Sequence, residues 1–252
     1  MKQLSSISLI FPAYNEELNI EKAAEAAHRA LTKYAEHFEI IIVDDGSKDR
    51  TAEIIDKLAA ENTKIVAVHH PVNRGYGGAL TSGFSKAQYD FVFFSDSDLQ
   101  FDLDEIGKLV EWANQYEIVA GYRAHRSDPW NRKLNAWGWN LVVRTMLGVK
   151  ARDIDCAFKL FQRKVFDNIN LTTAGAMINT EILWHAAKNG YRIKEIPVSH
   201  YPRVAGQQTG ANLKVIMRAF AELFRMKFRG NRNDINQSHN RIISSGNNAE
   251  NS

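Results

Sequence analysis

Short apolar segments alternate with longer amphipathic segments through the first 120 residues of the chain. The apolar segments are rich in β-branched and aromatic residues and predict strands, whereas the segments between them carry apolar residues at helical spacing. Strands alternating with helices of about ten or more residues predict βαβ units and a mostly parallel central sheet flanked by helices. The expected strands are 7–11, 38–43, 64–68, 89–95 and 117–120, and the expected helices are 16–34, capped by Asn15, then 51–60, 79–86 and 104–115.

Four of these strands end in polar or glycine-containing turns, at 12–16, 44–47, 96–100 and 121–123. In a parallel sheet the carboxyl ends of the strands lie along one edge, where open α/β sheets bind their ligands. A shared nucleotide crevice explains this coincidence better than four independent helix caps. The glycine-rich segment 73–78 is neither a dinucleotide fingerprint nor a P-loop. Tight helix packing explains that segment at least as well as ligand contact.

Asp96 and Asp98 lie one residue apart directly after the expected strand 89–95. In an extended backbone, residues i and i+2 face the same side, so both carboxylates and then Gln100 are expected on one face. Carboxylate and amide oxygens suit Mg²⁺ or Mn²⁺ that also holds phosphate oxygens. An acidic turn that caps the next helix would explain the motif alone equally well.

The composition excludes several classes of protein. A chain of 252 residues is long enough for one large α/β domain, and its net charge of +3 is too small to indicate nucleic-acid binding. The single cysteine, Cys156, excludes an internal disulfide and is expected to be a buried apolar residue. The apolar run 7–11 is too short for a secretory signal, and no run is long enough for a transmembrane helix, so a cytoplasmic location is expected.

Four motifs follow one another in the order PAYNEE at 12–17, DDGSKD at 44–49, NRGYGGAL at 73–80 and DSDLQ at 96–100. Together they closely resemble the family-2 inverting glycosyltransferases, which have the Rossmann-like GT-A fold of nucleotide-diphospho-sugar transferases. GYR at 121–123, DCAFKLF at 155–161 and EIPV at 195–198 are similar to the dolichol-phosphate mannosyltransferase branch. That branch moves a sugar from a nucleotide to a polyprenyl phosphate. The resemblance covers roughly residues 5–228.

The resemblance implies a role for each matching residue. The donor base and ribose would be held by Pro12, Tyr14, Glu16, Val43 and Asp45. The metal, Mg²⁺ or Mn²⁺, and the diphosphate would be bound by Asp96, Asp98 and Gln100, with the backbone of Ser97 contributing. The expected catalytic residues are Asp98, Arg123 and Arg203, whose arginines would hold the acceptor phosphate or the leaving diphosphate. The donor would be of the GDP-mannose or UDP-glucose type.

A phosphate acceptor is already an anion near neutral pH, so it needs little help from a general base. Glu181 is the nearest candidate for such a base, and its place in the first turn of a helix is well explained by helix electrostatics instead. Two alternatives stay open: transfer to a hydroxyl acceptor, and a catalytically silent nucleotide-sugar-binding protein.

Two departures from the branch pattern concern the acceptor side. Arg203 and Gly206 match an Arg-x-x-Gly-x-Ser motif, but Thr209 stands where the branch has lysine. Phe101-Asp102 replaces the usual His-Pro after DSDLQ. The Gln-x-x-Arg-Trp motif of processive synthases does not occur, so chain elongation is not expected.

Two segments, 130–148 and 211–229, combine apolar and basic residues in patterns that predict amphipathic helices. An apolar stripe beside a basic one is typical of a helix lying on an anionic bilayer, although a helix packed on the domain core has similar stripes. We expect a glycosyltransferase domain over 1–229 that attaches peripherally to the cytoplasmic membrane surface. The polar tail 230–252 is expected to be disordered. A partner protein would have to supply any membrane anchor.

Overall fold

The computed structural model describes residues 3–124, 138, 141–149, 151–167, 169–203 and 222–223. Its contacts divide the chain into a unit of residues Met1–Gln208 and a unit of residues Thr209–Ser252. The fold below is that of the first unit. The expected helix 211–229, apart from residues 222–223, and the expected tail 230–252 lie outside the described residues, so the domain boundary at 229 stays a prediction.

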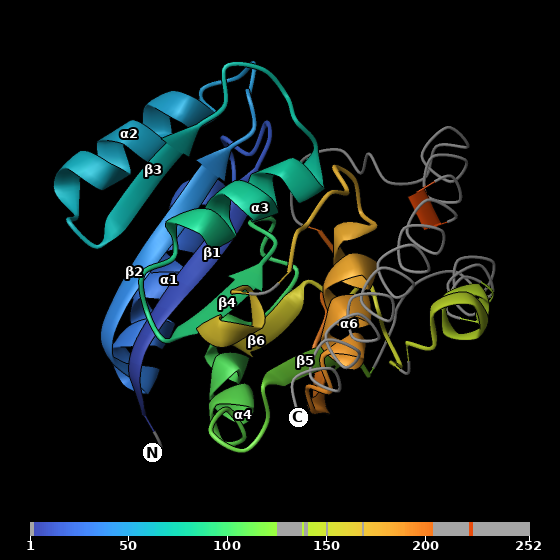
Figure 1. The fold of residues 1–252 in the computed structure, drawn as a ribbon. Helices are drawn as coiled ribbons and strands as arrows, with labels where there is room; N and C mark the ends of the chain where they lie inside the picture. Colours follow the sequence, from blue (N-terminus) through green and yellow to red (C-terminus); the bar gives the residue numbers. More distant parts are fainter. Residues whose placement is uncertain are drawn as a thin grey trace, which may run out of the picture. The chain divides into compact units, whose positions relative to one another are not determined.

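A seven-stranded sheet forms the centre of the first unit, with the strand order β3-β2-β1-β4-β6-β5-β7 (Figure 1). Six strands run parallel to one another, and β6 runs antiparallel to its neighbours β4 and β5. The strands are β1 Leu4–Ala13, β2 Ala35–Asp44, β3 Ile65–His69, β4 Phe91–Ser95, β5 Ile118–Arg123, β6 Phe158–Gln162 and β7 Ile193–Val198. The predicted mostly parallel sheet is confirmed, whereas β6 and β7 were not predicted as strands.

Helices cover both faces of this sheet. Figure 1 shows α3 in front of β1 and β2, and α1 behind them. The helices are α1 Ile20–Tyr34, α2 Thr51–Glu61, α3 Tyr76–Lys86, α4 Ile106–Val110 and α6 Ile178–Lys188, with 3₁₀ turns η1 Leu103–Glu105 and η2 Arg163–Val165. Residues 141–147 are also helical. No helix among the described residues is long and apolar enough to cross a bilayer.

Two of the expected helices differ from the structure at their ends. The first helix begins at Ile20 rather than near 16, because residues 17–19 form a turn before it; Asn15 itself is left-handed, with φ 56°. The Asn15 side chain does not cap this helix, since its Oδ1 accepts a hydrogen bond from the backbone N–H of Lys48 at 2.8 Å. The helix expected over 104–115 is only η1 and the five residues of α4, followed by a turn.

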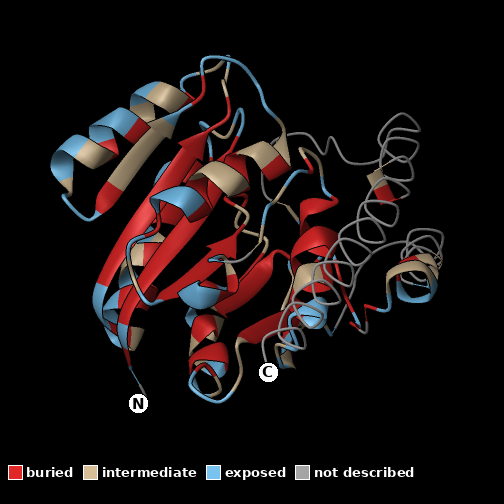
Figure 2. Ribbon diagram, in the orientation of Figure 1, coloured by how far each residue is buried: buried red, intermediate tan, exposed pale blue. Residues whose placement is uncertain are grey.

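The core is densest along β1, β2, β4 and β6 (Figure 2). Aromatic rings on the adjacent strands β4 and β6 pack together: Phe93 meets Phe158 edge-on with centroids 4.7 Å apart, and Phe94 stacks on Phe161. Burying each of these rings contributes about 1.5–3 kcal/mol to folding. This packing holds β6 beside β4, so the residues before β6 lie next to the carboxyl end of β4.

Candidate active site

The turns after β1 and β4 are joined directly at the carboxyl edge of the sheet. The hydroxyl of Ser97 donates a hydrogen bond of 3.1 Å to the backbone carbonyl of Pro12. Since β1 and β4 are parallel neighbours, this bond fixes the turn that carries Asp96 and Asp98 against the turn that carries Tyr14 and Glu16. Two of the four predicted strand-end turns therefore meet as expected.

The turn after β4 is sharply bent. The strand ends at Ser95, and Leu99 has a φ of 61°, in the left-handed region. The bend lets Asp98 Oδ1 accept the backbone N–H of Gln100 at 3.1 Å. The extended backbone expected over 96–100 is therefore wrong. Gln100 forms two hydrogen bonds with Tyr201. Its side-chain Nε2 donates to the backbone carbonyl of Tyr201 at 3.0 Å, and its backbone carbonyl accepts the N–H of Tyr201 at 2.8 Å.

Burial raises the pKa of both carboxylates in this turn. The pKa of Asp96 rises to about 7, because burial and then the charge of Asp98 disfavour its ionised form, while a hydrogen bond from Tyr76 opposes the rise. The pKa of Asp98 is also raised, mainly by burial. Two carboxylates close together, Asp98 buried and Asp96 partly buried, favour a bound cation, which would compensate their charges.

The chemistry of this pair fits a divalent metal ion. Asp96 Oδ1 accepts the Tyr76 hydroxyl at 3.0 Å, whereas Oδ2 accepts no hydrogen bond from a described residue. Carboxylate oxygens suit Mg²⁺ and Mn²⁺. The described residues hold no cluster of three His, Cys, Asp or Glu side chains able to bind a metal ion. A metal at this pair would take further ligands from other groups, such as the Gln100 amide oxygen, phosphate oxygens or water.

Arg203 contacts residues of both turns, the one after β1 and the one after β4. Its Nη2 donates a hydrogen bond to Glu16 Oε1, and its Nη1 lies 4.0 Å from Asp98 Oδ2. Glu16 is held in turn, since its Oε2 accepts the Asn19 side-chain amide at 2.7 Å. The structure thus brings together Glu16, Asp98 and Arg203, which the sequence assigned to the nucleotide, the metal and a phosphate. Gly206 and Thr209 lie outside the described residues.

Arg123 ends β5 and is held by a residue that the sequence analysis missed. Its Nε and Nη2 donate hydrogen bonds of 2.7 Å each to the two carboxylate oxygens of Asp153. Asp153 is buried in the segment before β6, which runs back to the carboxyl edge because β6 is antiparallel. In the sequence, only its position two residues before the DCAFKLF motif could have indicated a role for Asp153.

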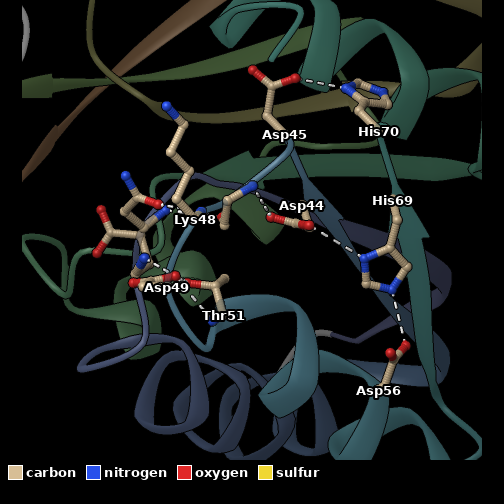
Figure 3. Close-up of polar contacts among 11 residues, drawn as sticks. Asp44, Asp45, Lys48, Asp49, Thr51, Asp56, His69 and His70 are labelled. Atoms are coloured by element: carbon tan, nitrogen blue, oxygen red, sulfur yellow. Dashed lines mark hydrogen bonds and ion pairs between the residues drawn. The ribbon is translucent and has the colours of Figure 1, made fainter. Parts of the chain in front are cut away.

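The turn after β2 uses its two aspartates for internal bonds (Figure 3). Asp45 Oδ1 accepts the N–H of Arg74 at 2.8 Å and contacts His70 Nδ1 at 2.6 Å, while Oδ2 accepts the N–H of Gly75 at 2.8 Å. Both oxygens of this buried carboxylate are therefore taken by the glycine-rich segment and by His70. In this structure Asp45 fastens that segment to β2, and its predicted contact with the donor would require some of these bonds to exchange.

The remaining residues predicted for the donor differ in exposure. Tyr14 is 37% exposed, so its ring is accessible to a ligand. Val43 is fully buried, because it lies inside the sheet between β1 and β3. Its side chain therefore packs in the core.

Glu181 lies in the first turn of α6, as predicted, and is buried. Its carboxylate accepts hydrogen bonds of 2.7–3.0 Å from the backbone N–H and the hydroxyl of both Thr172 and Thr173. This carboxylate clamps the segment before α6, which explains its position without any role as a base. Cys156 is buried too, and burial raises the pKa of its thiol to about 12, as expected for an unreactive core residue.

Comparison with known proteins identifies the family. The model of the family described as Glycosyl transferase family 2 matches residues 8–170. The chain belongs to this family. The matched residues include every predicted site residue except Arg203, and the family predicted from the motifs is confirmed.

Curated relatives of this family-2 chain include sugar transferases that act on a lipid phosphate. It is 34% identical over 207 residues to glycosyltransferase AglD of Haloferax volcanii, an alignment that covers 78% of the chain and 33% of that protein. It is 37% identical over 166 residues to an undecaprenyl-phosphate 4-deoxy-4-formamido-L-arabinose transferase of Pectobacterium atrosepticum, covering 64% and 50%. The protein of that name from Proteus mirabilis is 30% identical, with 85% and 66% covered. The chain thus spans between a third and two thirds of the length of these relatives.

Solved structures confirm the GT-A fold predicted for this family-2 chain. A glucosyl-3-phosphoglycerate synthase from Mycobacterium tuberculosis matches with a TM-score of 0.70 at 19% identity, covering 88% of this chain and 79% of that one. Another structure of that enzyme holds Mn²⁺, uridine diphosphate and glucosyl-3-phosphoglycerate, and matches with a TM-score of 0.67 at 19% identity, with 88% and 80% covered. At this identity the likeness establishes the fold alone.

Proposed function

We propose that this chain transfers a hexose from a nucleotide-diphosphate sugar to a polyprenyl phosphate, with inversion at the anomeric carbon. The observation that carries the proposal is the convergence of Asp96, Asp98 and Arg203 beside Glu16 at the carboxyl edge of the sheet. Carboxylates for a metal and a guanidinium for phosphate are the groups that a diphosphate leaving group requires. The undecaprenyl-phosphate transferases among the relatives support a lipid-phosphate acceptor.

The chain's own residues account for most of the reaction. An oxygen of the acceptor phosphate attacks the anomeric carbon while the bond from that carbon to the donor diphosphate breaks, and the diphosphate leaves with the electron pair. Asp96 and Asp98 would hold the metal, with Gln100 the third predicted ligand. A bound Mg²⁺ or Mn²⁺ neutralises the charge that develops on the diphosphate. Arg203 binds phosphate oxygens after exchanging its bond to Glu16, and Arg123 presents a guanidinium fixed by Asp153.

The need for a base bears on the proposed acceptor class. A hydroxyl acceptor must lose a proton and requires a general base, whereas a phosphate acceptor does not. Glu181 has both carboxylate oxygens occupied by threonine donors, so it is poorly placed to accept a proton. This favours the phosphate acceptor. Transfer to a hydroxyl group is the alternative, and it would require a base at another residue.

A transfer assay tests the proposal. The full chain is incubated with Mg²⁺ or Mn²⁺, a short polyprenyl phosphate, and radiolabelled GDP-mannose or UDP-glucose in parallel. We expect label in the lipid phase with one donor, lost on chelation and in Asp98→Asn. The matched control Asp102→Asn, at an exposed aspartate four residues along the chain, keeps the activity. Label that reaches only water-soluble products would contradict the phosphate acceptor, and transfer that survives chelation would contradict the metal.

We also propose that the chain works at the cytoplasmic face of a membrane, attached peripherally and helped by a partner that supplies an anchor. Polyprenyl phosphates are lipids, so the reacting phosphate lies at a bilayer surface. Sedimentation with anionic liposomes tests this placement. We expect the protein to sediment with the liposomes at low salt and to be released at high salt, because attraction between basic residues and anionic lipids is screened. Protein wholly in the supernatant at low salt would contradict it.

A further inference from the structure

A lysine lies fully buried behind the predicted metal site. Lys159 is on β6, directly opposite Phe94 of β4, and has no exposed surface. Its Nζ donates hydrogen bonds to the backbone carbonyls of Ile154, at 3.0 Å, and Cys156, and to Asn179 Oδ1 at 3.1 Å. Burying an ammonium group costs several kcal/mol unless polar partners surround it. Three oxygen acceptors supply those partners here.

Asn179 lies between Lys159 and Tyr76 and contacts both side chains. Because Asn179 Oδ1 accepts from Lys159, its side-chain NH₂ group is the part left to donate. Asn179 is also a hydrogen-bond partner of the Tyr76 hydroxyl, and since its Oδ1 is taken by Lys159, its NH₂ group is the donor in that contact. The Tyr76 hydroxyl then donates to Asp96 Oδ1 at 3.0 Å. Every donor in this chain of bonds points in the same direction, from the ammonium group to the carboxylate.

Tyr76 has little freedom to leave this position. It lies between two glycines that pack directly on the segment before α6: a Cβ on Gly75 would lie 2.5 Å from the Ala174 carbonyl oxygen, and one on Gly77 would lie 2.3 Å from that of Thr173. The N–H of Gly77 donates to the Ala174 carbonyl at 2.8 Å. The segment itself is clamped by Glu181. The start of α3 is therefore fixed against the start of α6, which carries Asn179.

We propose that Lys159, Asn179 and Tyr76 are positioning residues for metal binding: their hydrogen bonds hold Asp96 by Oδ1 and so present Oδ2 to the divalent cation. The inference deepens the proposed function and rests on its metal-dependent step. Hydrogen bonds aligned in one direction reinforce one another in a buried site. Outer partners of this kind orient the carboxylates that bind a metal, and losing one typically weakens metal binding 10–100-fold.

Mn²⁺ binding to the full chain tests this role separately from catalysis. Free Mn²⁺ is measured by electron paramagnetic resonance, with GDP or UDP present in parallel. We expect Tyr76→Phe, which removes only the hydroxyl, to bind Mn²⁺ about tenfold more weakly than the wild type. The matched control is Tyr191→Phe, which loses a hydrogen bond of 3.3 Å from the tyrosine hydroxyl to the Lys164 carbonyl. Tyr191 lies just before β7, at the amino end of that strand and so away from the carboxyl edge that carries the site. This control should bind Mn²⁺ as the wild type does.

A second variant tests the direction of the bonds. Asn179→Asp keeps an acceptor for Lys159 but cannot donate to Tyr76, so the tyrosine hydroxyl would turn toward the new carboxylate and release Asp96. We expect a similar loss of Mn²⁺ affinity with little change in the unfolding midpoint. This variant replaces Tyr76→Phe as the deciding one if the latter does not fold.

The outcomes separate this inference from the proposed function. If the wild type binds Mn²⁺ and the folded variants bind it equally well, the positioning role is overturned while the proposed function stands. If the wild type binds no Mn²⁺ with either nucleotide, the metal-dependent step and the positioning role both fall.

Discussion

Arg123 and Asp153 form a two-point ion pair, with both carboxylate oxygens accepting from the guanidinium at 2.7 Å. The two side chains are only 15% and 9% exposed. The pair raises the pKa of Arg123 above its ordinary value, although burial alone would lower it. It therefore fixes the direction of the guanidinium and joins β5 to the segment before β6.

Replacing Asp153 with asparagine should destabilise the protein by about 3 kcal/mol, because it leaves the Arg123 charge buried and uncompensated. Urea unfolding measures this loss. The matched control is Asp104→Asn, which breaks an ion pair of 2.8 Å with Lys33 whose side chains are about half exposed. That control should cost much less, because ion pairs exposed to solvent contribute little to stability. If the two variants lose equal free energy of unfolding, the Arg123–Asp153 pair does not stabilise the fold more than an exposed ion pair does.

Glu181→Gln should weaken the clamp on Thr172 and Thr173 and destabilise the fold by about 2 kcal/mol, because hydrogen bonds to a charged group are lost. The pH dependence of the transfer rate should stay as in the wild type. A general base contributes about 10²–10⁴-fold to a rate. A rate loss of that size in a variant with wild-type stability would therefore identify Glu181 as a base and favour a hydroxyl acceptor.

Gly77→Ala should destabilise the protein by about 2 kcal/mol, since the new methyl group would overlap backbone atoms that have little room to move. Gly107→Ala is the matched control, because there the methyl group meets only the ring end of the Tyr34 side chain, at 2.6 Å. That ring can turn aside, and alanine favours a helix by about 1 kcal/mol over glycine. Thermal unfolding compares the two, and equal shifts would contradict the close packing described for Gly77.

Acid should remove a contribution that Glu117 makes to stability. A hydrogen bond from Arg192 is the main cause that lowers the pKa of Glu117 from 4.5 to about 2 in the folded protein. A carboxyl group with a lowered folded-state pKa stabilises the fold above its unfolded-state pKa, and this stability is lost as pH falls. Between pH 4.5 and 2 the wild type should thus lose more stability than Glu117→Gln.

The control for this acid effect is Glu25→Gln. Glu25 lies 3.9 Å from Arg29 on the exposed side of α1, with 62% of its side chain accessible. In urea titrations, the free energy of unfolding of Glu25→Gln should change with pH in parallel with that of the wild type. A Glu117→Gln curve that also runs parallel would show that the Glu117–Arg192 contact does not persist in solution.

The sheet could largely be predicted from the sequence because buried parallel strands are continuous apolar runs. The strand β6, the last but one along the chain, was missed for a physical reason. Lysine is the second of the five residues Phe158–Gln162, and lysine is almost never fully buried. Lys159 is the exception, since two backbone carbonyls and Asn179 surround its ammonium group.

The candidate site was predictable to the extent that strand ends determine it. Asp96, Asp98 and Glu16 lie on turns that the parallel sheet brings to one edge, and the resemblance added Arg203. Bonds between side chains distant in sequence were not predictable. Asp153 lies 30 residues from Arg123, and Asn179 lies close to Tyr76 only through the packing of α3 against the segment before α6. The ligand contacts of Asp45, Gln100 and Arg123 stay predictions.

The place of β6 in the sheet also sets the order in which the protein can be assembled during synthesis. β4 and β5 are made before β6, yet β6 lies between them and pairs with both. Until residues 158–162 have left the ribosome, the phenylalanine-rich β4 keeps one edge unpaired, and an exposed apolar edge of this kind is prone to aggregate. Contacts between segments distant in sequence form slowly. The nascent chain therefore passes through a vulnerable stage that ends only when β6 is inserted.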